Sequence, residues 1–138
     1  MLTKSDLEKL AQIRLDDAIL LFSVGKSSSA YYLAGYSIEL ALKACISKIF
    51  QPNVIPDKAL VNATYTHKLQ DLIKVSGLLP EFNNEIKSNS DFAANWGIVS
   101  KWTESSRYQL WDQITTATLI NSIQDPENGV FQWVINHW

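Results

Sequence analysis

The segment from Ala30 to Ile49 constrains the fold most, because it is apolar on nearly every side of a helix. Its polar residues recur three or four positions apart and form one narrow stripe, which comprises Tyr32, Tyr36, Glu39, Lys43 and Ser47. A helix of this kind is stable only when other elements surround it. We therefore predict that this segment is the central helix of a helical protein.

Helical spacing of apolar residues also marks the segments on either side. Ser5 and Glu8 form a capping-box pattern at the start of the first segment, and Gly25 ends it. We expect helices over residues 5–24, 27–49, 67–76, 80–101 and 108–123, followed by a short one that opens at Asp125-Pro126. Residues 51–66 contain two prolines and several Asn and Asp residues, so they predict a connecting loop with at most one helical turn.

Three finer expectations follow from the same spacing. Thr66 is the expected cap of the helix that begins at His67, and the residues from Ser88 to Asp91 can divide the 80–101 helix. The 108–123 helix is expected to bury Leu110, Ile114, Ala117 and Ile120. No segment alternates with a period of two residues, so the fold class is all-α, an antiparallel up-and-down bundle of about five helices that forms one domain over residues 1–138.

Composition excludes several classes of protein. The chain has 12 Lys and Arg against 14 Asp and Glu, a net charge of −2, and 46% of its residues are hydrophobic, which excludes disordered tails and polybasic nucleic-acid arms. The five tryptophans therefore favour core packing and a dimer interface over base stacking in a basic groove. One cysteine and two distant histidines predict no disulfide framework, no metal and no cofactor.

The N-terminal segment and the longest apolar stretches of the chain indicate where in the cell the protein is expected. No run of 18 apolar residues exists, and the N-terminal segment is amphipathic rather than a charged head followed by an apolar core. We therefore expect a cytoplasmic protein that does not enter a membrane.

The charged residues in the polar stripe need partners, because an unpaired charge on a buried helix is costly. Glu39 can pair with Lys43 one turn along the helix, or it can hold Arg107 from the segment before the 108–123 helix. Alternatively, the stripe is a polar groove that binds a ligand or partner, and both readings can hold at once. His67 can make a structural hydrogen bond to another helix, or it can take part in such a groove.

Four parts of the sequence resemble HEPN domains, the helical domains named for higher eukaryotes and prokaryotes nucleotide-binding. The most specific part is the run from Ala30 to Ala44, AYYLAGYSIELALKA. The other matching residues are Arg14, Asp17, Ala18, Leu21 and Gly25 in the first helix, the run Thr66-His67-Lys68-Leu69, and the run Ser106-Arg107-Tyr108. The resemblance therefore touches most of residues 5–120.

The resemblance implies an up-and-down bundle that is commonly dimeric and, in prokaryotes, is encoded beside a small nucleotidyltransferase or within toxin-antitoxin and antiviral systems. Many HEPN domains are metal-independent ribonucleases whose motif is an arginine, a polar residue and a histidine four to six residues after the arginine. No histidine follows Arg107 in that window. We therefore expect a non-catalytic, homodimeric binding module with no catalytic residue, whose partner is a nucleotide, an RNA or a small nucleotidyltransferase.

The expected roles within such a site differ from residue to residue. Arg107 is the expected contact for an anion, with Tyr108 beside it, and the residues expected to shape the groove are Tyr36, Glu39, Lys43 and His67. A second hypothesis is a divergent ribonuclease in which His67 approaches Arg107 in space and supplies the missing imidazole. A third is a structural dimerisation domain without a ligand.

Overall fold

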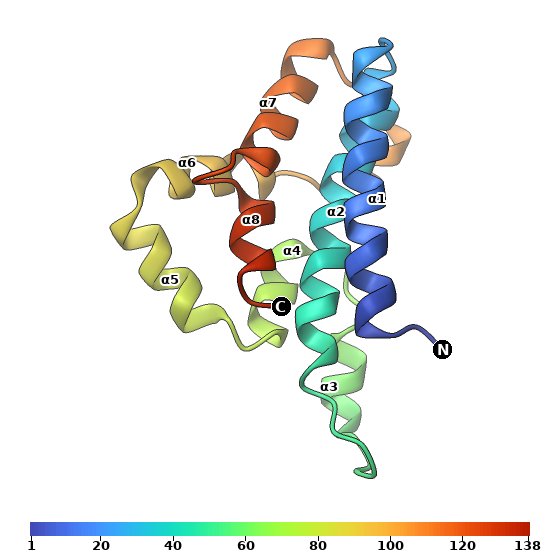
Figure 1. The fold of residues 1–138 in the computed structure, drawn as a ribbon, viewed down its shortest axis with the longest axis vertical. Coiled ribbons are helices and arrows are strands. Elements are labelled where there is room, and N and C mark those ends of the chain that lie inside the picture. The colour runs from blue at the N-terminus through green and yellow to red at the C-terminus, as the bar shows by residue number, and fades with distance from the viewer.

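Two long antiparallel helices form the spine of the computed structural model, which describes residues 1–138 (Figure 1). Helix α1 (Lys4–Ser23) is followed by a short turn, and α2 (Ser27–Ser47) returns along it. Gly25 lies in the turn with a φ of +83°, a left-handed conformation that explains why glycine ends the first helix. Both helices were predicted from the sequence. The cap of α1 was not, because Thr3 and Asp6, rather than Ser5 and Glu8, form the capping box.

Helix α2 is the central element, as its apolar character predicted. It packs against α1, α4, α7, α8 and the 3-10 helix η1. Alanines at positions 30, 34, 41 and 44 are completely buried, which allows the neighbouring helices to approach closely. The residues of α2 therefore contact most other parts of the protein.

Shorter helices surround this pair and complete an all-α structure. They are α3 (Lys58–Ala63), α4 (Leu69–Val75), α5 (Leu79–Ser88), α6 (Ser90–Val99), η1 (Glu104–Tyr108), α7 (Gln113–Gln124) and α8 (Val130–Ile135). In Figure 1, α5 and α6 lie on the side away from α1, while α7 and α8 lie between them and the α1–α2 pair. The all-α class is confirmed, but the expected number of about five helices is wrong, because the chain forms eight α-helices and one 3-10 helix.

Local side-chain hydrogen bonds explain one break within a predicted helix and one helix that starts later than predicted. At Asn89 the backbone is extended, and its side chain accepts a hydrogen bond from Phe92 N, which ends α5 and caps α6. Thr66 does not cap a helix that starts at His67, because its hydroxyl accepts from Lys68 N and the helix begins at Leu69. His67 therefore lies in the connection before α4.

The region after η1 departs further from the prediction. The chain is not helical between Gln109 and Asp112, and Asp112 caps α7 by accepting from Thr115 N at 2.6 Å. This backbone hydrogen bond lowers the pKa of Asp112. Leu110 lies in this non-helical stretch and is 97% exposed instead of buried, and Ile114, in the first turn of α7, is 81% exposed instead of buried. The buried face of α7 is formed by Thr116, Leu119, Ile120, Ser122 and Ile123.

The last helix also starts later than its Asp-Pro signal predicted. Asp125 accepts hydrogen bonds from Glu127 N and Asn128 N, so residues 125–128 form a turn, and α8 begins at Val130. No helix in the structure combines the length and the apolar character that a membrane span requires.

The predicted packing of the tryptophans against the core is confirmed, whereas their place in a dimer interface stays a prediction. Trp102 belongs to the buried core, and the partly buried Trp96, Trp111, Trp133 and Trp138 pack against it. Trp111 stacks on Tyr31 with a centroid distance of 3.7 Å. These contacts tie the second half of the chain to α2.

Candidate functional site

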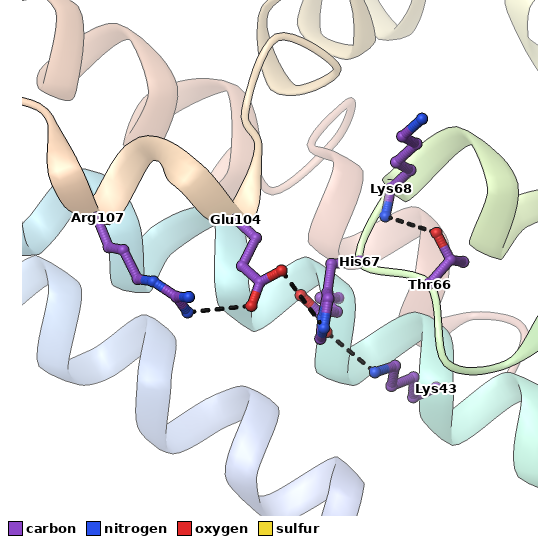
Figure 2. A network of polar contacts seen from close by, with 7 residues as sticks. Lys43, Thr66, His67, Lys68, Glu104 and Arg107 are labelled. Atoms are coloured by element: carbon purple, nitrogen blue, oxygen red, sulfur yellow. Dashed lines mark hydrogen bonds and ion pairs between the residues drawn. The ribbon is translucent and has the colours of Figure 1, made fainter.

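Charged side chains from three parts of the chain form a row beside α2. Figure 2 shows Arg107 and Glu104 from η1, His67 from the connection before α4, and Lys43 from α2. Glu39, also on α2, links His67 to Lys43. We call these five residues the charged row. Arg107, His67, Glu39 and Lys43 were predicted as site residues, whereas Glu104 was not.

Glu39 is the most buried member of the charged row, with only 1% of its side chain exposed. Its Oε1 atom accepts a hydrogen bond from Lys43 Nζ at 3.0 Å and lies 2.7 Å from His67 Nδ1. Its Oε2 atom is enclosed and accepts no hydrogen bond. The pairing of Glu39 with Lys43 is therefore confirmed, and the alternative pairing with Arg107 is wrong, because His67 and Glu104 lie between them.

His67 lies between two carboxylates. An ionised carboxylate only accepts hydrogen bonds, so the Nδ1 atom that faces Glu39 carries a proton. The other ring nitrogen, Nε2, lies 3.4 Å from Glu104 Oε2. The imidazole is thus oriented by a buried carboxylate and presents Nε2 to the surface, where 44% of its side chain is exposed.

Arg107 ends the charged row at the surface. Its NH1 donates to Glu104 Oε1 at 3.0 Å, and its guanidinium lies 4.9 Å from the centre of the Tyr108 ring. The Tyr108 and Tyr32 side chains raise the pKa of Arg107 above its already high ordinary value, so it is cationic at neutral pH. Tyr108 is 78% exposed, which leaves most of its ring free for contact with another molecule.

One tryptophan positions η1 beside α2. Trp102 is 2% exposed, and its indole Nε1 donates to the carbonyl of Tyr32 at 3.2 Å. A Cβ atom on Gly35 would lie 2.2 Å from the indole ring, so only glycine permits this close packing. Neither contact was predicted, because each joins residues that are distant in sequence.

Tyr36 was predicted in the site but lies at its edge. Its ring stacks on Tyr32 at a centroid distance of 5.9 Å, and Tyr32 in turn stacks on Trp102 at 6.0 Å. Burial, followed by the negative charge of Glu39, raises the pKa of Tyr36. Tyr36 therefore remains a neutral phenol next to the charged row.

Two grooves meet at the charged row. The larger has a volume of about 590 Å³ and is lined mainly by polar residues, namely Thr66, His67, Lys68, Gln70, Ser100, Trp102, Thr103, Glu104 and Ser105. The smaller has a volume of about 340 Å³ and is lined by Ser28, Ser29, Tyr32, Leu33 and Arg107. Glu104 and Arg107, which are paired with each other, therefore belong to different grooves.

This arrangement is suited to binding a polar, anionic group at the surface. Arg107 supplies a permanent positive charge, His67 supplies an oriented imidazole, and hydroxyl groups line both grooves. No three His, Cys, Asp or Glu side chains converge in a way that could hold a metal ion. No family model, curated protein sequence or solved structure matches this chain.

Proposed function

We propose that this protein is a non-catalytic, HEPN-like binding module of the up-and-down type that recognises a nucleotide through its phosphate. The observation that carries the proposal is the pairing of an exposed cation with an exposed aromatic ring, Arg107 on Tyr108, where Arg107 lines the smaller groove. The resemblance of residues 30–44 to HEPN domains supports the same class of ligand. A homodimer that associates with a small nucleotidyltransferase, in a cytoplasmic toxin-antitoxin or defence system, is the setting proposed for this module.

Arg107 is the proposed contact for the phosphate. A guanidinium offers a planar set of donors that fits carboxylate and phosphate oxygens, and here it already holds one carboxylate. Its side chain is 41% exposed, so a ligand can reach it from solvent. The Tyr108 ring next to it offers a surface on which a base can stack.

Replacement of Arg107 tests this assignment directly. Arg107→Ala is expected to weaken binding of AMP by about tenfold or more, because a charge-assisted hydrogen bond to the phosphate is lost. Isothermal titration calorimetry measures the affinity, and circular dichroism checks that helical content is unchanged. Lys101→Ala is the matched control, since it removes one exposed positive charge outside the charged row. Equal affinity in wild type and Arg107→Ala would remove Arg107 from the site.

A divergent ribonuclease is the second candidate, and the surroundings of His67 favour it. The imidazole has a buried carboxylate on Nδ1 and a surface-facing Nε2, which is the orientation that a general base or acid requires. Arg107 lies two contacts away through Glu104 and could stabilise a phosphate that is being cleaved. In this candidate, His67 takes the role of the histidine that does not follow Arg107 in sequence.

An RNA cleavage assay separates the two candidates. If the protein is a ribonuclease, a mixed RNA is expected to be cleaved in the presence of a metal chelator, and His67→Ala and Arg107→Ala should each abolish cleavage. His137→Ala is the control, because it removes the other histidine of the chain, which contacts the Trp133 carbonyl instead. Intact RNA after incubation with a well-folded wild type, whose mass in solution is measured first, would contradict ribonuclease activity. If the wild-type protein also binds no nucleotide, the third hypothesis, a dimerisation domain without a ligand, is the one left.

A further inference from the structure

The carboxylate of Glu104 lies between Arg107 and His67 in the charged row. Its Oε1 accepts from Arg107 NH1 at 3.0 Å, and its Oε2 faces His67 Nε2 at 3.4 Å. Each oxygen therefore contacts a different partner, as two oxygens of a phosphate would. The partners are 41% and 44% exposed and the carboxylate is 35% exposed, so the position is accessible from solvent.

The two partners of Glu104 each have a further contact that does not involve Glu104. His67 is fixed from behind by the buried carboxylate of Glu39, and Arg107 lies against the Tyr108 ring. Glu104 contacts only these two partners through its side chain, and it projects from a short 3-10 helix at the surface. A rotation of the Glu104 side chain would therefore free the position while the two donors stay in place.

The charges in the row also match a phosphate monoester. Lys43 balances Glu39, and Arg107 balances Glu104, so the row is neutral when His67 is neutral. When Glu104 turns away, Arg107 presents its positive charge and His67 its imidazole to a ligand. A phosphate monoester carries close to two negative charges at neutral pH.

The geometry points to a phosphate-monoester site between Arg107 and His67, at the position that the Glu104 carboxylate occupies, with Glu104 as a built-in competitor for the ligand. This inference rests on the proposed function and names the residue that sets the affinity and the selectivity for the phosphate. A dianionic terminal phosphate is attracted to the site strongly enough to offset the lost contacts of Glu104. A ligand with a single negative charge is attracted less and does not displace Glu104.

The test compares AMP binding to wild type and to Glu104→Gln by isothermal titration calorimetry. The variant keeps the shape of the side chain but removes the competing charge, so AMP is expected to bind about tenfold more tightly. Adenosine, which lacks the phosphate, should show no such gain. Glu81→Gln is the matched control, since it removes an exposed carboxylate from α5, outside the charged row. Glu104→Ala gives a second variant, and circular dichroism checks the fold of each.

A double variant tests whether His67 is part of the same site. His67→Gln should weaken AMP binding about tenfold in the Glu104→Gln background, because the second donor to the phosphate is lost. An unchanged affinity in that background would overturn the assignment of His67.

The outcomes also separate this inference from the proposed function. AMP binding by wild type with no gain in Glu104→Gln or Glu104→Ala would overturn the competitor role and leave the nucleotide-binding module in place. AMP binding by Glu104→Gln but not by wild type would support the competitor role, since the Glu104 carboxylate would then explain why wild type binds no AMP. An absence of binding to wild type and to both Glu104 variants would overturn the inference together with the proposed function.

Discussion

Gly35→Ala is expected to destabilise the protein by about 3 kcal/mol, although alanine normally strengthens a helix. The added Cβ atom would lie 2.2 Å from the Trp102 ring, which is 2% exposed and packed in the core. The indole would also lose its hydrogen bond to the Tyr32 carbonyl if it shifted. Chemical denaturation followed by circular dichroism measures the free energy of unfolding.

Gly97→Ala is the matched control for this experiment. Gly97 also lies within a helix, α6, but a Cβ atom there would meet no atom within 4 Å. The control is therefore expected to be neutral or to stabilise the protein by up to about 1 kcal/mol, the difference in helix propensity. Similar effects of the two substitutions would contradict the steric explanation. The double variant Gly35→Ala/Trp102→Leu should lose less stability than the sum of its single variants, since the smaller side chain removes the clash.

Lys43→Met is expected to cost about 2 kcal/mol, because it leaves the buried Glu39 carboxylate without its nearest cation. Glu39 is 1% exposed and its Oε2 already accepts no hydrogen bond, so water cannot replace the ammonium group readily. The effect lies below the largest values for buried pairs because Lys43 itself is 25% exposed and His67 stays in contact with Oε1. The free energy of unfolding in urea measures the loss.

The removal of the Glu39 charge should restore much of that stability. In the double variant Glu39→Gln/Lys43→Met no charge is left unpaired, so we expect it to be more stable than Lys43→Met alone. Lys9→Met is the control, because Lys9 is an exposed lysine on α1 with no ion pair. If the double variant were as unstable as the sum of its single variants, Glu39 and Lys43 would not act as a pair.

The parts of the structure that depend on local spacing could be predicted from the sequence. Helices α1 and α2 have long runs at helical spacing with Gly25 between them, and the pair of Glu39 with Lys43 follows from their separation of one helical turn. The break at Asn89 was predicted in the same way. For these features, residues within a few positions of each other determine the outcome.

The parts that depend on distant contacts could not be predicted. Leu110 fits a helical pattern, but the hydrogen bond from Trp111 N to Ser28 Oγ holds its segment outside the helix, and Ile114 lies in the first turn of α7 with its side chain exposed. Glu104 separates Arg107 from Glu39 only because Trp102 fixes η1 beside α2. A pairing of Glu104 with Arg107 could have been noted from their spacing of three residues, whereas its contact with His67 has no local signal.

The origin of the charged row in three separate segments has a consequence for folding. The α1–α2 pair closes through a short turn, so its contacts form between neighbouring parts of the chain and can appear early. The contact of His67 with Glu39 spans 28 residues, and that of Trp102 with Tyr32 spans 70, so each closes a long loop. A nascent or partly folded chain that contains only the first two helices therefore carries Glu39 and Lys43 without their partners, and the charged row is complete only when the later segments have folded onto α2.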